Sequence, residues 1–293
     1  MQVLVTGANG FIGKKLVNLL LKKSINTIGL DLTKDAIIQC DLLNPNEIKT
    51  VFDEYSPEII IHLAAISSTQ KSVQTAIKTQ NINFLGTVNL LEIALNHNSE
   101  LKYFVLASSA EVYGGLSDRY YNEKDLVEPI TPYAASKAAA ESFVLMRGHQ
   151  NGLKTCCIRF CNTFGRIDNN TFLIEYLFHS FLTNKIPVIN APNSVREFMY
   201  FPDHLRVYES ILDNQPSGII NASSGESSSI LEIANKIKKI TGKKIQITTN
   251  SEINPTKILL NTEKLQKLGY KKKYSVDKGL ATFYGEIGKL DNV

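Results

Sequence analysis

The stretch TGANGFIG, residues 6–13, decides the fold of this chain. It comes after a short apolar run typical of a strand and leads into a helical pattern. In this setting Gly7 permits a tight turn, Gly10 lets the backbone approach a phosphate, and Gly13 lets helix and strand pack closely. The N-terminus of the helix faces the anion. The stretch therefore predicts a dinucleotide site, and we expect these residues to bind the cofactor: Gly7, Asn9, Gly10, Phe11, Ile12 and Gly13.

Strand-like and helix-like segments alternate through the first half of the chain. The apolar runs EIIIHLAA (58–65) and LKYFVLASS (101–109) lie on either side of the helical pattern INFLGTVNLLEIAL (82–95). Continuous apolar strands that alternate with helices predict a parallel sheet covered on both faces. Because such crossovers are right-handed, we expect an α/β fold with a doubly wound, Rossmann-type sheet.

The pattern loosens after KTCCIRF (154–160), where Asn, Pro and aromatic residues are scattered. We therefore predict a NAD-binding Rossmann domain at residues 1–162 and a smaller, mainly substrate-binding lobe at 163–293. Residues from about 203 to 224 are expected to return to the main sheet. Within the lobe, SILEIANKIKKITG (229–242) predicts one amphipathic helix.

Composition argues against several classes of protein. The 293 residues carry a net charge of +4, and the lysine excess lies in KIKKITGKK (236–244) and KLGYKKK (267–273). Such runs are typical of a solvated helix face rather than a nucleic-acid patch, although a mild excess suits a phosphate-bearing substrate. The four cysteines show no C-x-x-C spacing, which favours buried thiols and predicts no metal site. Without a signal peptide or an apolar run of about 18 residues, we expect a cytoplasmic protein with no membrane partner.

An acidic residue is expected about 20 residues beyond the glycine turn, and Asp31 ends the second strand-like run there. Its carboxylate can accept hydrogen bonds from ribose hydroxyls and repel a 2′-phosphate, which favours NAD over NADP, although nearby Lys34 weakens that preference. Asp41, next to Leu42, would suit the adenine edge. A plain helix N-cap is an equal interpretation of Asp41.

The stretch TPYAASKAAAE, residues 131–141, places Tyr133 and Lys137 four positions apart in a predicted helix. Residues at this spacing share one helical face, so the lysine can reach the space beside the phenol. A surface tyrosine beside a surface lysine is the plain alternative. A free tyrosine has a pKa of about 10, and lowering it by about three units takes roughly 4 kcal/mol. Two positive neighbours, the ammonium and a nicotinamide ring, favour the phenolate that a general base needs.

With these features the chain resembles the extended branch of the short-chain dehydrogenase/reductases, the NAD-dependent epimerase/dehydratase family that acts on nucleotide sugars. The resemblance covers most of the chain. Its motifs occur in the family's order: TGANGFIG (6–13), HLAA (62–65), NFLGTVNLLE (83–92), SSAEVYG (108–114), PYAASK (132–137), RFCNTFG (159–165), REFMYFPD (196–203) and NASSGE (221–226).

The resemblance implies roles for individual residues. Tyr133 is the acid/base, Lys137 also holds the nicotinamide ribose, and Ser109 hydrogen-bonds the reacting hydroxyl. The strand-end residues Leu63, Ala64 and Ala65 let NAD pass close to the backbone. The substrate is expected to contact Ser67, Ser109, Asn162 and Arg196.

Some assignments stay open. For Arg196, whose guanidinium suits a diphosphate, a surface ion pair with Glu197 or Asp203 is the alternative. Asn83 is either a helix-bend residue or a site residue. Relatives dimerise through two long helices, here residues 84–97 and 133–148, so the resemblance implies a homodimer.

The two residues after Ser109 narrow the choice of reaction. Relatives that remove water carry an Asp-Glu pair there, whereas this chain has Ala110 and Glu111, which argues against 4,6-dehydration. Glu111 is our further catalytic candidate, with a structural carboxylate as the alternative. We expect a 4-epimerase that retains NAD. The alternative is an NAD(P)H-dependent reductase of a nucleotide-linked 4-keto-6-deoxy sugar, and a non-catalytic NAD(P) sensor is disfavoured because Tyr133 and Lys137 are both kept.

Overall fold

The computed structural model describes residues 1–251 and 254–290, and the chain divides into two units. Unit 1 consists of Met1–Val112, Val127–Arg159 and Ile211–Ile220. Unit 2 consists of Tyr113–Leu126, Phe160–Ser210 and Asn221–Val293. Each unit has its own sheet and its own hydrophobic core.

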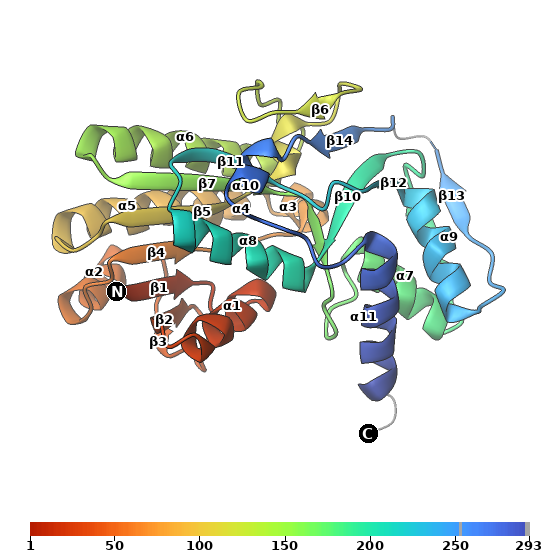
Figure 1. Cartoon of the computed structure of the whole chain (residues 1–293), viewed down its shortest axis with the longest axis horizontal. Coiled ribbons are helices and arrows are strands. Elements are labelled where there is room, and N and C mark those ends of the chain that lie inside the picture. Colours follow the sequence, from red (N-terminus) through yellow and green to blue (C-terminus); the bar gives the residue numbers. More distant parts are fainter. Residues whose placement is uncertain (252–253, 291–293) are drawn as a thin grey trace. The chain divides into compact units, whose positions relative to one another are not determined.

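A seven-stranded sheet forms the centre of unit 1 (Figure 1). Its strands, in order across the sheet, are β11 (Gly218–Ala222), β7 (Lys154–Phe160), β5 (Tyr103–Ser109), β4 (Ile59–His62), β1 (Gln2–Thr6), β2 (Asn26–Asp31) and β3 (Ile38–Gln39). β1 pairs in parallel with both β2 and β4, and β3 and β5 extend the sheet in parallel on either side. The chain turns from one half of the sheet to the other at β1 and β4, which is the switch point where such sheets bind ligands. The Rossmann fold predicted from the sequence is confirmed.

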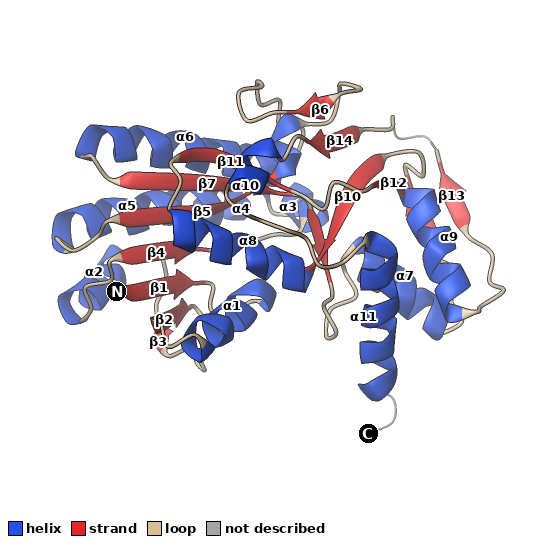
Figure 2. Cartoon of the chain, in the orientation of Figure 1, coloured by secondary structure: helices blue, strands red, loops and turns tan. Residues whose placement is uncertain are grey.

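Helices lie on both faces of this sheet (Figure 2). The helical segments of the first 151 residues are α1 (Phe11–Lys22), α2 (Pro45–Glu54), α3 (Thr69–Gln74), α4 (Ala76–Gln80), the π-helical turn η1 (Asn81–Leu85), α5 (Gly86–His97), the 3₁₀ turn η2 (Ala110–Tyr113) and α6 (Pro132–Asn151). The core on one face joins α2, α5 and α6 to the strands through fully buried side chains such as Ile48, Leu90 and Val144. This core fixes α6, and with it the residues predicted to be catalytic.

The start and end of α6 result from local chemistry. Thr131 is the N-cap, and its side chain accepts a hydrogen bond from the backbone N–H of Ala134. Pro132 occupies the first turn, where its missing N–H costs nothing. Gly152 ends the helix in the left-handed region at φ 64°. These signals place Tyr133 in the first turn of the helix.

Unit 2 is built on a mixed sheet. Its path runs β12 (Ser227–Ser229), β10 (Val195–Tyr200), β14 (Lys257–Leu260) and β6 (Tyr120–Tyr121), with β8 (Asn162–Phe164) also paired to β10. A separate pair joins β13 (Thr248–Asn250) to β9 (Val188–Asn190). The helices are α7 (Leu173–Leu182), α8 (Phe201–Asn214), α9 (Ile230–Thr241), α10 (Glu263–Lys267) and α11 (Val276–Leu290). The residues of α8 and β11 are divided between the two units.

The amphipathic helix predicted over 229–242 is confirmed as α9. Ser229 and Glu232 form a capping box at its start, and Gly242 at φ 66° ends it. Its buried residues Ile233 and Ile237 join the core of unit 2.

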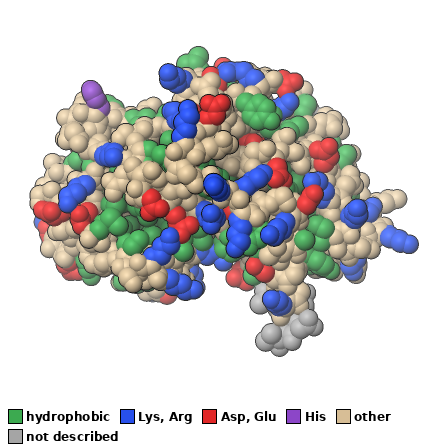
Figure 3. All heavy atoms as spheres, in the orientation of Figure 1, with side chains coloured by type: hydrophobic (Ala, Val, Ile, Leu, Met, Phe, Trp, Pro, Cys, Tyr) green, Lys and Arg blue, Asp and Glu red, His purple; other side chains and the backbone are tan. Residues whose placement is uncertain are grey.

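The basic runs carry acidic partners within unit 2. Lys236 pairs with Asp277 at 2.6 Å, and Lys272 pairs with Glu226 at 2.5 Å. Figure 3 shows acidic side chains among the basic ones on the face in view. In the part of the chain that the structure describes, no helix has the length and apolarity to cross a membrane. The four cysteines are buried free thiols.

Candidate active site

The glycine turn packs tightly against the end of β4. Gly7 has φ 69°, and a Cβ there would lie 2.8 Å from the backbone nitrogen of Ala64. A Cβ on Gly13 would lie 2.0 Å from the carbonyl oxygen of Gly7, and the N–H of Gly10 donates to that same oxygen at 3.0 Å. The turn therefore brings backbone without side chains to the start of α1, where the N-terminus of a helix attracts an anion.

The two predicted acidic residues have different settings. Asp31, at the end of β2, accepts the N–H of Asn9 in the glycine turn at 3.0 Å and that of Thr33 at 3.2 Å. Asp41 accepts the N–H of Leu43 at 2.9 Å. The N-cap of α2 is Asn44, so the interpretation of Asp41 as a helix N-cap is wrong. Asp31 thus ties the glycine turn to the second strand, and half-buried Asp41 shapes the turn beyond β3, beside buried Leu42.

The residues after β4 form a half-buried strip. Leu63, Ala64 and Ala65 are neither fully buried nor exposed, whereas Ser67 is exposed. Asn83, in η1, closes on this strip: its Oδ1 accepts the N–H of Ile66 at 2.8 Å and its Nδ2 donates to the Ile66 carbonyl at 3.0 Å. Asn83 is therefore both a residue of a π-helical bend and a residue that holds the loop beside the predicted site.

Tyr133 and Lys137 lie on the buried face of α6, with 8% and 3% of their surface exposed. The alternative of a surface tyrosine beside a surface lysine is wrong. The Lys137 ammonium donates to the carbonyl oxygen of Ala107, in β5, at 2.8 Å. Burial lowers the pKa of Lys137 to about 8, although the carboxylate of Glu141 opposes the shift. The helix thus holds a cation that is easily neutralised next to the end of β5.

This burial predicts an unusual pH dependence of stability. Between about pH 8 and its ordinary pKa of 10.5, Lys137 keeps its proton only in the unfolded chain, so stability rises with pH through this window. Below the window the lysine is charged in both states, and its full cost of about 3 kcal/mol applies. Lys137→Met removes this cost but also loses the bond to Ala107, so we expect it to raise the free energy of unfolding at neutral pH by only about 1–3 kcal/mol. Urea unfolding of both proteins across pH tests this, and a difference independent of pH would contradict it.

Ser109 ends β5 and is followed by η2. Its Oγ accepts the N–H of Glu111 at 3.2 Å, and the Ser109 side chain is 8% exposed. Ala110 is buried and carries no ionisable group. The structure therefore brings Ser109, Tyr133, Lys137 and Glu111 to one unit, at the C-terminal end of β5 and the start of α6, where parallel sheets build their sites.

The other two predicted substrate residues belong to unit 2. Asn162 begins β8 opposite Phe198 of β10. Arg196, also in β10, donates from its guanidinium to the carbonyl oxygens of Val195 and Thr256, at 2.9 and 3.0 Å, and to the Thr256 hydroxyl at 2.7 Å. These bonds hold the Arg196 guanidinium in one orientation, close to β8 and β10, the paired strands that carry Asn162 and Arg196.

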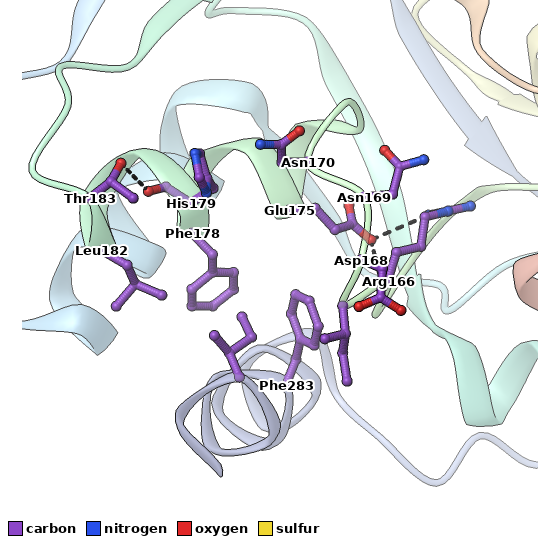
Figure 4. A pocket seen from close by; sticks show the side chains of 12 residues that line it. Arg166, Asp168, Asn169, Asn170, Glu175, Phe178, His179, Leu182, Thr183 and Phe283 are labelled. Carbon is purple, nitrogen blue, oxygen red and sulfur yellow. Dashed lines mark hydrogen bonds and ion pairs between the residues drawn. The ribbon is translucent and has the colours of Figure 1, made fainter. Parts of the chain in front are cut away.

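Unit 2 also contains a cavity of about 460 Å³ between α7, α11 and the loop at 166–170 (Figure 4). None of the predicted site residues lines it. On its wall, Glu175 accepts the backbone N–H groups of Gly165 and Arg166 at 3.0 Å each and pairs with the Arg166 guanidinium at 3.3 Å. Because these contacts neutralise the buried charge of Glu175 and the partly buried charge of Arg166 within the wall, this pair is not available as an ionic anchor for a ligand.

A buried ion pair lies behind Lys137 and was not predicted from the sequence. Glu141 and Arg159 are each 3% exposed, and the guanidinium donates to the carboxylate at 2.7, 3.0 and 3.1 Å. Two signals point to it in retrospect. Glu141 lies one helical turn beyond Lys137, and Arg159 is a lone charge in the apolar strand CCIRF.

The fold and this site define a Rossmann-type enzyme with a tyrosine–lysine pair. A family model described as the NAD dependent epimerase/dehydratase family matches residues 3–223, and the chain belongs to that family. The chain is 29% identical over 298 residues to a UDP-glucuronate 4-epimerase of Thermodesulfobacterium geofontis, covering 89% of this chain and 90% of the relative. It is 28% identical to a probable dTDP-glucose 4,6-dehydratase of Sinorhizobium fredii, covering 81% of this chain and 75% of the relative.

Among solved structures, the UDP-glucose 4-epimerase of Thermus thermophilus in complex with NAD superposes with a TM-score of 0.90. It is 25% identical and the match covers 98% of this chain and 99% of that one. For the present chain, the cofactor is NAD. The glycine turn fits NAD, because it leaves no room for a side chain at Gly7 or Gly13 and Asp31 lies at the end of β2.

Gly13→Ala is expected to weaken NAD binding. The added Cβ would meet the Gly7 carbonyl oxygen at 2.0 Å, so the turn must move away from α1. We expect the NAD affinity to fall at least about tenfold, equivalent to about 1.4 kcal/mol. Gly285→Ala in α11, where nothing lies within 4 Å of the new Cβ, is the matched control. Calorimetric titration of both variants with NAD, after removal of the bound cofactor, checks this, and equal affinity in the two variants would contradict the assignment of the turn.

Proposed function

We propose that this enzyme epimerises the C4 centre of a nucleotide-diphosphate sugar and retains its NAD between turnovers. The observation that carries the proposal is the buried Tyr133–Lys137 pair of α6, whose lysine donates to Ala107 of β5, the strand that ends at Ser109 and is followed by Ala110. The family includes both epimerases and dehydratases among the relatives of this chain, so the choice rests on these residues.

Tyr133 is proposed to take the proton from the C4 hydroxyl and to return it after the 4-keto sugar has rotated in the site. Lys137, buried and positive at neutral pH, favours the phenolate and holds the nicotinamide ribose. Ser109 orients the reacting hydroxyl. When bound, NAD supplies the hydride acceptor and donor. Because the same site oxidises and reduces the sugar, no external reductant is consumed.

The position after Ser109 supports epimerisation over loss of water. Removal of water needs an acid as well as a base, and the buried methyl group of Ala110 has no proton to give. Glu111 donates its backbone N–H to Ser109. We propose that this bond orients the Ser109 hydroxyl, and that the Glu111 carboxylate lies within reach of the sugar.

The two units are proposed to bind different ligands. Unit 1 binds NAD through the glycine turn, Asp31, the strip after β4 and the turn at Asp41. Unit 2 is proposed to bind the nucleotide diphosphate through Asn162 and Arg196, since a planar guanidinium suits paired phosphate oxygens and three acceptors hold that of Arg196 in one orientation. Ser67, exposed after β4, is proposed as a sugar contact.

We further propose a homodimer formed by α5 and α6. Met146 of α6 and Leu85, the last residue of η1 just before α5, are large apolar side chains at the surface, 42% and 44% exposed. Ile77, just before it in α4, is 80% exposed. A second copy would cover these side chains, and sedimentation measurements on Met146→Glu would show a monomer if this face is the interface.

The first experiment is to denature the purified enzyme and identify the released nucleotide by mass spectrometry. About one NAD per chain, together with interconversion of UDP-glucose and UDP-galactose or of their uronic acids without added cofactor, supports the proposal. An empty protein that consumes NAD(P)H only with 4-keto-6-deoxy sugars would replace it by the reductase. Accumulation of a 4-keto product with loss of water would replace it by the dehydratase.

A further inference from the structure

A buried chain of hydrogen bonds runs from the strip after β4 to the helix that carries Tyr133. His62, the last residue of β4, lies between two threonines: its Nδ1 is 2.6 Å from Thr6 Oγ1 and its Nε2 is 2.9 Å from Thr87 Oγ1. At one end the N–H of Ala64 donates to Thr6 Oγ1 at 3.3 Å. At the other end Thr87 donates to the carbonyl oxygen of Asn83 at 2.6 Å.

The direction of every bond in this chain is settled by counting protons. A threonine hydroxyl has one proton, and Thr87 gives its proton to Asn83, so it can only accept from His62. His62 must therefore carry its proton on Nε2. In a neutral ring Nδ1 is then an acceptor, and Thr6 donates to it. Thr6 in turn accepts from Ala64.

The neutral ring is required by its surroundings. His62 is 1% exposed, with Phe104 at 6.1 Å between ring centroids. Burial, assisted by the charge of Lys137, lowers the pKa of His62 to about 3. The imidazole is therefore uncharged throughout the neutral range, and its tautomer is set by the two threonines.

Asn83 continues the connection to α6. Its Nδ2 donates to the Ser136 hydroxyl at 3.0 Å, and that hydroxyl donates to the carbonyl oxygen of Tyr133 at 2.7 Å. The N–H of Tyr133 donates to Ser72 Oγ at 3.2 Å. Both backbone groups of the tyrosine are thus held by buried serines, and one of these serines is held by the chain from His62.

We propose that His62, as the Nε2–H tautomer, is a positioning residue that locks η1 and the first turn of α6, and so holds Tyr133 in place; this role in catalysis rests on the proposed function. The opposite tautomer would aim a nitrogen lone pair at the oxygen of Thr87. Thr87 would then have to release the backbone carbonyl of Asn83, the residue whose side-chain amide binds Ile66 and Ser136. The strip beside NAD and the tyrosine would both lose a fixed support.

The first test needs no substrate. In the NAD-loaded enzyme labelled with ¹⁵N-histidine, long-range proton–nitrogen NMR spectra distinguish the two tautomers, and the His62 signals are identified by their absence from His62→Gln. We expect the Nε2–H pattern, unchanged between about pH 6 and pH 8. The Nδ1–H pattern or a protonated ring would overturn the inference.

The second test breaks the chain away from His62. Thr87→Val is expected to lower kcat about tenfold to a hundredfold, as a small misplacement of a catalytic group does, with KM for the nucleotide sugar unchanged. Thr87→Ser should restore the rate, because the hydroxyl returns. Thr27→Val, in β2 of the same unit, removes a buried hydroxyl that donates to the Ile25 carbonyl at 2.9 Å, and it should keep the wild-type kcat.

Equal rates in Thr87→Val and the wild type, or failure of Thr87→Ser to recover activity, would overturn the positioning role. If Thr87→Val does not fold, the tautomer in the wild type still decides. The proposed function fails separately. If the wild type and Thr87→Ser both show the Nε2–H pattern but turn over no nucleotide sugar, the hydrogen-bond chain is supported and the proposed reaction is contradicted.

Discussion

Tyr133→Phe is expected to lower kcat by roughly 10²–10⁴-fold, the range that removal of a general acid/base produces. The phenyl ring fills the same buried space, so the fold and the glycine turn are unchanged. NAD bound per chain should therefore stay close to the wild-type value, and KM for the nucleotide sugar should change little. Steady-state kinetics and mass spectrometry of the released cofactor measure the two quantities on the same preparation.

Tyr103→Phe is the matched control for this loss. Tyr103 is fully buried in β5 of the same sheet, and its hydroxyl donates to the carbonyl oxygen of Pro216 at 2.7 Å. Its removal should cost about 1 kcal/mol of stability and leave kcat unchanged. A Tyr133→Phe enzyme that turns over like Tyr103→Phe would remove Tyr133 from the proposed chemistry.

The fold was predictable because its signals are local and repeated. The glycine turn at Gly7–Gly13, the continuous apolar runs of β4 and β5, and the predicted helix of Tyr133 and Lys137 each agree with the same architecture. Such agreement between levels is what makes a sequence specify one structure. The helix α9 was predicted for the same reason, with Ser229 and Gly242 marking its ends.

The support of the site was less predictable because it depends on pairs far apart in the chain. Thr6, His62 and Thr87 are ordinary residues of three different elements, and their relation appears only when β1, β4 and α5 come together. The N-cap of α2 illustrates a local limit: Asp41 and Asn44 are both good caps, and the structure uses Asn44.

Glu141 is where the buried pair behind Lys137 can be tested most sharply. Glu141→Leu leaves the Arg159 guanidinium in the interior without its carboxylate, and the free energy of unfolding is expected to fall by about 3–5 kcal/mol. The double variant Glu141→Leu/Arg159→Met removes both charges and should recover most of that loss. Asp53→Ala, which breaks the exposed Lys49–Asp53 pair of 2.7 Å, should cost less than about 1 kcal/mol. Urea unfolding of the four proteins measures these differences.

The same pair also acts on Lys137, since the Glu141 carboxylate raises the pKa that burial lowers. In the double variant that opposing charge is gone, so the pKa of Lys137 should fall further while the fold is kept. A lysine that is neutral at lower pH supports the Tyr133 phenolate less well. The double variant is therefore expected to be stable in urea. On the alkaline side of its pH–rate profile, it should lose activity at a lower pH than the wild type does. A stable double variant with an unchanged pH–rate profile would show that Glu141 and Arg159 serve the fold alone.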